Sequence, residues 1–191
     1  MKKLTTPIDR SKLIELSAGD QILLSGDILV FRDAVHRILC DHLREGKPLP
    51  FNLRDEVLYY CGPTPASHGL PVGSAGPTTA SRMDPYTAPL FEQGLAVTIG
   101  KGERSQEIVE LHKKYKTVYM LAVGGTGAFI AQHITKVSVI AFPELGTEAV
   151  HRFTVVDMPV IVGIDTKGKM AFPLAPACPP LLQNQRGEVK E

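Results

Sequence analysis

Apolar residues recur along the chain with two periods, one typical of strands and one typical of helices. Between Gln21 and Phe31, β-forming residues alternate around Ser25–Asp27, which predicts a strand that turns into a second strand or a strand extension. From Arg32 to Arg44 the apolar residues follow helical spacing. Arg32 is therefore expected at the junction between a strand and a helix.

A short buried strand is predicted from Glu56 to Cys61, and a long loop follows it. Residues 62–77 are rich in Gly, Pro, Ser and Ala and contain almost no charge. At roughly sixteen residues, this loop is longer than most connections in compact domains, and such loops are typically functional or disordered. Because the loop leads directly to Thr78, we favour a functional loop.

The second half of the chain alternates regularly between strand and helix patterns. This alternation predicts a three-layer α/β domain. Strands are expected at residues 95–99, 117–122, 136–142, 150–155 and 160–165, and helices at 105–115 and 128–133, with a glycine turn at 100–102.

Composition restricts the class of protein. With 191 residues, of which 43% are hydrophobic, the chain is expected to form one domain over residues 1–172, followed by a proline-rich tail, 173–191, on the surface or disordered. A net charge of +1 argues against nucleic acid as a partner. No apolar run is long enough to span a bilayer and the start lacks the apolar core of a signal peptide, so we expect a soluble, cytoplasmic protein without a membrane partner.

The cysteines suggest no cofactor held by this chain alone. Cys40, Cys61 and Cys178 are widely separated and form no Cys-x-x-Cys pair. Neither a disulfide framework nor a self-contained zinc or iron–sulfur site is indicated, and no metal ligand is assigned to this chain.

The most informative segment is the expected helix start after the long loop. Pro77 suits the first helical position and Gly76 the cap, which would leave the amides of Thr78 and Thr79 as free donors for an anion. In a helix, Thr78 and Arg82 would stand four residues apart on one face. Ordinary helix capping beside a surface arginine accounts for the same residues, so the segment alone leaves both interpretations open.

Two glycine turns share only part of the pattern of a nucleotide site. Residues 99–102 lack the upstream glycine and the Gly-Lys-Ser/Thr of a phosphate-binding loop. Residues 123–127 lie between a strand and a helix, but Ile130 stands where a dinucleotide fingerprint needs its last glycine, and no Asp ends the next strand. A close-packed strand-to-helix turn is favoured over nucleotide binding.

Four motifs occur in an order that resembles a known family. They are Phe31-Arg32-Asp33-Ala34-Val35-His36-Arg37, Tyr59-Tyr60-Cys61-Gly62-Pro63-Thr64-Pro65-Ala66, Gly76-Pro77-Thr78-Thr79 with Arg82-Met83-Asp84, and Ile99-Gly100-Lys101-Gly102. Together they resemble the β subunit, or C-terminal domain, of class I iron–sulfur fumarate hydratases and of the related L-tartrate dehydratase. The resemblance covers nearly the whole chain except the proline-rich tail.

The resemblance implies a swivelling β/β/α domain that closes over a [4Fe-4S] cluster held by a separate α subunit. It also implies that Arg32, Thr78, Arg82 and Lys101 face a dicarboxylate substrate. The guanidinium groups of Arg32 and Arg82 suit a bidentate carboxylate clamp, and Lys101 adds a compact third charge. Thr78 is then the candidate proton acceptor, which demands a cationic, dry pocket or a neighbouring base.

Other polar residues have less definite roles. Asp33 and His36 flank Arg32 and are candidates to orient it, although Asp33 is equally placed to act as a first-turn helix charge. His68, in the long loop, is a candidate substrate contact or a solvated side chain. The residues expected to support the helix start or to serve as structural partners are Thr79, Asp84 and Glu148.

From the resemblance we expect the β subunit of a heteromeric hydro-lyase that interconverts fumarate and (S)-malate and is active only with its α subunit. An L-tartrate dehydratase β subunit is the alternative closest in chemistry. A non-catalytic anion-binding domain is the alternative from another class. Without its partner the chain could expose a face that is normally covered, and it could then form a homo-oligomer in isolation.

Overall fold

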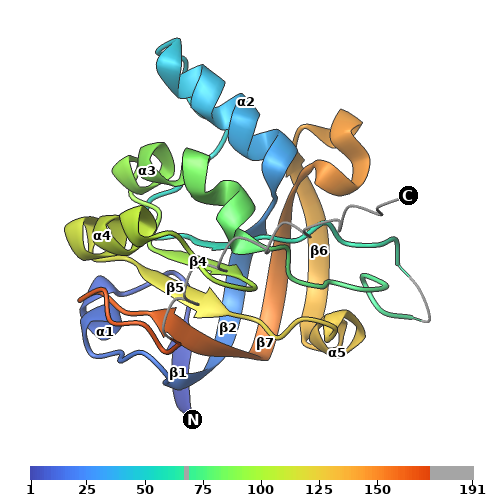
Figure 1. The fold of residues 1–191 in the computed structure, drawn as a ribbon. Helices are drawn as coiled ribbons and strands as arrows, with labels where there is room; N and C mark the ends of the chain where they lie inside the picture. The colour runs from blue at the N-terminus through green and yellow to red at the C-terminus, as the bar shows by residue number, and fades with distance from the viewer. Residues whose placement is uncertain (67–68, 173–191) are drawn as a thin grey trace, which may run out of the picture.

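The fold is built on a seven-stranded mixed sheet within the described residues, which are 1–66 and 69–172 of a computed structural model (Figure 1). Its strands are β1 (Lys2–Thr5), β2 (Gln21–Val30), β3 (Val57–Tyr59), β4 (Val97–Gly100), β5 (Val118–Leu121), β6 (Ile134–Ala141) and β7 (Val150–Ile164). The helices are α1 (Arg10–Ile14), α2 (Asp33–Arg44), α3 (Asp84–Glu92), α4 (Gln106–Tyr115) and α5 (Gly127–Ala131), with short 3₁₀ helices η1 (Ala80–Met83) and η2 (Pro143–Glu148).

The sheet closes on itself through one long strand. Strands β1 to β5 pair in sequence order and in parallel. Strand β7 runs antiparallel and pairs with β5 and β6, and also with β2. The β2–β7 pairing joins β2, β3, β4, β5 and β7 into a ring, which the 15 residues of β7 are long enough to complete.

Alternation along the strands separates two apolar cores. Ile28 and Val30 of β2 point into the core inside the ring of strands, whereas Leu29 and Phe31 point into a second core. This second core lies between the strands and helices α2, α3 and α4, which gather on one side of the sheet in Figure 1. The period-2 pattern of the sequence produces this arrangement because successive strand residues face opposite ways. The expected α/β class is confirmed.

One β-bulge explains two errors in the predicted elements. The expected turn around Gly26 and the expected break between strands 150–155 and 160–165 are a single irregularity, where the β2–β7 register shifts. Gly26 has φ 110° and Asp157 has φ 48°, and the Asp157 amide donates to Ser25 Oγ at 2.9 Å. A bulge bends paired strands without ending them, so β2 and β7 each continue through it.

The other strands and helices α2, α4 and α5 match the predictions to within a few residues, whereas β1, α1, α3 and η2 were not predicted. Helix α5 runs from Gly127 to Ala131 rather than over 128–133. The proline-rich segment 173–191 lies outside the described residues. No helix in the described part of the chain has the length and apolar character needed to cross a membrane.

Candidate functional site

The segment that precedes η1 is extended rather than helical. Pro77 pairs with Cys61, which follows β3, and Thr79 pairs with Lys101, which follows β4. The predicted helix beginning at Pro77 is therefore wrong. The fixed φ of proline suits an extended segment as well as a first helical turn, and pairing with neighbouring strands decides between them.

The same pairing removes Thr78 as a backbone anion donor. Its amide donates to the carbonyl of Tyr60 at 2.7 Å, and its carbonyl accepts from the Lys101 amide at 3.0 Å. The helix begins only at Ala80, whose amide donates to the Lys101 carbonyl at 2.8 Å. The backbone of Thr78 is thus fixed on both sides, and only its side chain remains free to act.

Four residues singled out in the sequence line one cavity of about 560 Å³. They come from separate parts of the fold: Arg32 precedes α2, Thr78 is in the extended segment, Arg82 is in η1 and Lys101 follows β4. The rest of the lining is small or polar and consists of Gly62, Ser74, Gly76, Pro77, Thr79, Gly125, Gly127 and Ala128. Three cations and one hydroxyl therefore share a concave site.

Two of these cations carry ion pairs at the edge of the cavity. Arg32 Nε donates to Glu148 Oε1 at 3.0 Å, and Arg82 Nε donates to Asp33 Oδ1 at 3.0 Å. Both pairs are partly exposed, so each contributes little to stability and leaves the guanidinium able to bind a carboxylate as well. Within the described residues, no acidic group lies within ion-pair distance of Lys101.

Asp33 and His36, the candidates to orient Arg32, contact different groups. Asp33 lies in the first turn of α2, but its carboxylate holds Arg82 rather than Arg32. His36 is fully buried, and its Nδ1 lies 2.8 Å from the carbonyl oxygen of Arg32. Burial lowers the pKa of His36 to about 4, so the ring is neutral at pH 7 and supports the backbone of Arg32 rather than acting on a ligand.

Glycines let the wall of the cavity approach its functional groups. A Cβ at Gly62 would lie 3.0 Å from Arg32 Nε and 3.1 Å from its Cζ. A Cβ at Gly127 would collide with the hydroxyl of Ser74 and lie 3.0 Å from the amide nitrogen of Gly76. The glycine-rich composition of this region thus has a direct structural reason.

The Thr78 side chain is 8% exposed and borders the cavity. None of the described groups forms a hydrogen bond with its hydroxyl. Thr79 is exposed at the position before η1, where its side chain makes no capping hydrogen bond. His68 lies outside the described residues.

The sequence did not predict that Glu148 contacts Arg32, and it did not identify Arg104 as part of the site. Glu148 is 116 residues from Arg32 in sequence, so no local spacing could have paired them. Arg104 follows Lys101 by three residues in what reads as a polar turn, yet its side chain is fully buried. Asp84, expected to be structural, is its ion-pair partner at 2.6 Å.

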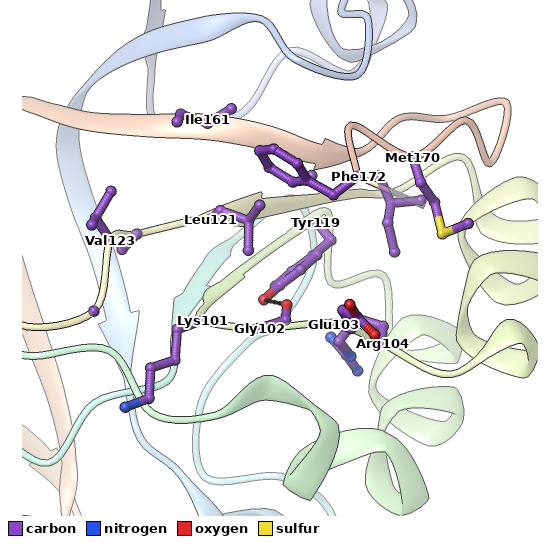
Figure 2. Close-up of a pocket in the computed structure, with 14 residues that line it drawn as sticks. Lys101, Gly102, Glu103, Arg104, Tyr119, Leu121, Val123, Ile161, Met170 and Phe172 are labelled. Carbon is purple, nitrogen blue, oxygen red and sulfur yellow. Dashed lines mark hydrogen bonds between the residues drawn. The ribbon is translucent and has the colours of Figure 1, made fainter. Parts of the chain in front are cut away.

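A second cavity of about 360 Å³ lies on the other side of the Lys101–Gly102 turn (Figure 2). Apolar side chains such as Leu121, Val123 and Phe172 dominate its lining. The ammonium of Lys101 points away from these side chains in Figure 2. The cation-rich cavity is therefore the one suited to an anionic ligand.

The described residues do not supply ligands for an iron–sulfur cluster. Cys40 and Cys61 are both buried, and burial raises the pKa of the Cys61 thiol to about 12. Cluster ligation requires thiolates, which such a site disfavours. Among these residues there is also no group of three His, Cys, Asp or Glu side chains that could hold a metal ion.

Comparison with known proteins agrees with the motifs. Residues 2–174 match the family model described as fumarase C-terminus. The chain is 38% identical over 170 residues to fumarate hydratase 2 of Leishmania major, covering 86% of this chain and 30% of that protein. It is 36% identical over 164 residues to the aerobic class I fumarate hydratase of Escherichia coli K12, covering 85% of this chain and 30% of that protein.

A shorter relative matches over most of its length. The chain is 32% identical over 174 residues to the L(+)-tartrate dehydratase subunit beta of Escherichia coli K12, covering 88% of this chain and 85% of that subunit. In contrast, the chain spans about 30% of the length of the fumarate hydratases named above. With the motifs in the predicted order and the family model matched over residues 2–174, the chain belongs to the fumarase C-terminus family.

Proposed function

We propose that this chain is the β subunit of a heteromeric hydro-lyase that interconverts fumarate and (S)-malate by reversible hydration. The observation that supports this most strongly is the convergence of Arg32, Arg82, Lys101 and Thr78 on one cavity. Relatives named as fumarate hydratases support the same assignment.

In this proposal the three cations bind the substrate. Fumarate and malate carry two carboxylates, and a guanidinium fork matches a carboxylate bidentately at any working pH. Arg32 and Arg82 form the clamp, with Glu148 holding Arg32 Nε and Asp33 holding Arg82 Nε and Nη2. Lys101, the cation without an ion pair among the described residues, stabilises the negative charge that develops when a proton leaves carbon.

Thr78 is proposed as the proton acceptor. Its backbone is held by Tyr60 and Lys101, so the hydroxyl has a fixed origin at the cavity wall. A threonine hydroxyl is a weak base at its ordinary pKa and needs a cationic, dry surrounding or a second base. The three cations supply the positive surrounding, and closure against the partner chain would supply the dryness. Neutral, buried His36 does not supply a second base, which would then come from the partner chain.

We further propose that the reaction requires an α subunit. A [4Fe-4S] cluster held by that subunit would supply a Lewis acid for the hydroxyl that leaves or adds. Residues of the present chain bind and orient the dicarboxylate and accept the proton. Swivelling of this chain over the partner would exclude water from the cavity.

L-tartrate dehydratase is a second candidate because the chain covers 85% of that beta subunit, a relative of similar length. Tartrate differs from malate by one hydroxyl, a difference that one hydrogen bond can recognise. Ser74, whose hydroxyl lies at the cavity wall beside Gly127, is the described side chain best placed for such a bond.

Steady-state assays of the anaerobically reconstituted complex on (S)-malate and L-tartrate test the assignment. We expect the larger kcat/KM on malate. A larger value on tartrate would select the dehydratase. Tight binding of a small anion by this chain alone, with no activity gained from an α subunit, would instead support a non-catalytic anion-binding domain.

A further inference from the structure

A fully buried arginine lies directly behind the site. The side chain of Arg104 has 0% exposure, and it follows Lys101 by three residues. Burying a guanidinium removes it from water at a cost of several kcal/mol, which pairing and hydrogen bonds must offset. The contacts of Arg104 therefore show what this charge holds in place.

Its guanidinium joins the turn after β4 to the beginning of α3. Arg104 Nε donates to Asp84 Oδ1 at 2.6 Å, and Arg104 Nη2 donates to Thr87 Oγ1 at 2.7 Å. The second oxygen of Asp84 accepts from the Ser105 amide at 2.9 Å, and the Thr87 hydroxyl donates to the Met83 carbonyl at 2.9 Å. These four hydrogen bonds link the two segments or anchor one of them, and Arg104 Nη1 also donates to the Tyr60 hydroxyl at 3.5 Å.

Two tyrosines enclose the guanidinium. Its carbon lies 5.3 Å from the ring centroid of Tyr119 and 5.7 Å from that of Tyr60, distances typical of cation–π contacts. The Tyr119 hydroxyl donates to the Gly102 carbonyl at 2.8 Å, a bond drawn in Figure 2 above Arg104. The carbonyl of Tyr60 accepts the Thr78 amide. The two tyrosines that pack on Arg104 are therefore bonded to both segments of the site, Tyr119 through its hydroxyl and Tyr60 through its main-chain carbonyl.

These contacts fix the segments that carry Lys101 and Arg82 to each other at two points. At one end, the backbones of Thr78 and Lys101 are hydrogen-bonded to each other. At the other end, the Asp84 carboxylate accepts hydrogen bonds from the Arg104 side chain and from the Ser105 amide. Arg82 lies between these points on one segment. Loss of the second point would let the two segments move relative to each other while the first remained.

We propose that Arg104 is a positioning residue that sets Arg82 against Thr78 and Lys101 without touching the substrate. The proposal rests on the function proposed above. A misplacement of about 1 Å can cost about 100-fold in rate, so even a small shift between the two segments becomes measurable. An arginine is not needed for stability alone, because apolar side chains of similar volume often replace buried ion pairs without loss.

The test uses the complex with its α subunit and a paired substitution. Arg104→Met combined with Asp84→Asn removes the charge pair without leaving either charge buried alone. Arg104→Lys keeps the charge but loses the planar fork. Circular dichroism and Tm check folding, and rates are normalised to cluster content.

The control is the ion pair of Arg10 and Asp55, which also joins separate segments but is partly exposed and lies at the opposite end of β4. Arg10 Nε donates to Asp55 Oδ1 at 2.5 Å, and its other nitrogens bond the carbonyls of Gly94 and Tyr115. Arg10→Met with Asp55→Asn therefore disturbs a second arginine-centred network away from the cavity.

We expect the Arg104/Asp84 pair to raise KM about tenfold and to lower kcat about 10- to 100-fold, with Arg104→Lys between it and the wild type. The control pair should stay within about twofold of wild type in both constants, even if its Tm falls as much. The proposal would be overturned if the Arg104/Asp84 variant kept the wild-type KM and lost activity only because fewer complexes were folded and active.

Binding of succinate, a dicarboxylate that cannot be hydrated, separates this proposal from the proposed function. If the wild-type complex binds succinate but does not hydrate fumarate, the proposed function fails. Positioning is still supported in that case if succinate binds more weakly to the Arg104/Asp84 variant but not to the control variant. Equal succinate affinity in all variants contradicts positioning. Absence of succinate binding by the wild type contradicts both.

Discussion

Replacement of Thr78 by valine should separate catalysis from binding. Valine keeps the branched shape of threonine and removes only the hydroxyl, for which none of the described groups provides a hydrogen bond. The neighbouring backbone bonds to Tyr60 and Lys101 do not involve the side chain. The three cations that would hold the dicarboxylate stay in place, so the KM for malate should change by no more than about threefold.

The expected loss of rate is much larger than any loss of stability. A positioned proton acceptor contributes roughly 10²- to 10⁴-fold, which corresponds to about 3–5 kcal/mol of activation free energy. At 8% exposure and without a hydrogen bond to lose, the substitution should shift the free energy of unfolding by about 1 kcal/mol. A domain with about 5–15 kcal/mol of stability remains folded.

The assay compares kcat for malate dehydration by anaerobic complexes with wild-type, Thr78→Val and Thr78→Ser chains. Serine retains a hydroxyl and should recover most of the rate lost in the valine variant. If the valine variant keeps a kcat within about threefold of wild type, Thr78 does not accept the proton.

Three further predictions test the surroundings of the site. Gly62→Ala should raise KM several-fold, because the added Cβ would lie 3.0 Å from Arg32 Nε. The control Gly124→Ala should leave KM unchanged, because its Cβ would lie at an ordinary contact distance of 3.6 Å from Lys101 Cδ; equal KM values for the two variants would show that the Gly62 contact does not place Arg32. Glu148→Gln should raise KM by a smaller factor than Arg32→Met, since it frees Arg32 without removing it; the reverse order in steady-state kinetics would contradict the clamp. Acidification from pH 6.5 towards 4 should destabilise the protein, because His36 takes up a proton in the unfolded chain but not in the folded chain, where its pKa is lowered to about 4. When the free energy of unfolding, measured with urea, is plotted against pH, its slope should be smaller in His36→Phe by up to about 1.4 kcal/mol per pH unit, and an unchanged slope would contradict this.

Much of the fold could be predicted because its signals are local. Period-2 alternation and helical spacing identify β2, α2 and α4, and Ser105 caps α4 by accepting from the Ile108 amide as its position suggests. The bulge at Gly26 and Asp157 could not be predicted, because it depends on two strands more than a hundred residues apart. Glycine and aspartate in each strand look like turns until the pairing partner is known.

The candidate site was predicted in its residues but not in its local structure. The motifs named Arg32, Thr78, Arg82 and Lys101, and all four line one cavity. Their local setting was wrong at Thr78, where strand-like pairing replaces the expected helix start. Arg104 was missed because burial depends on tertiary packing, and a charged residue in a turn is normally exposed.

The central claim is that this chain completes an active site whose other half is on a partner. Loss of fumarate absorbance should be measured anaerobically for this chain alone, for a cluster-loaded α subunit alone and for the two together. The account predicts that neither chain alone hydrates fumarate and that the mixture does. Equal rates for the α subunit with and without this chain, or an inert mixture, would contradict it.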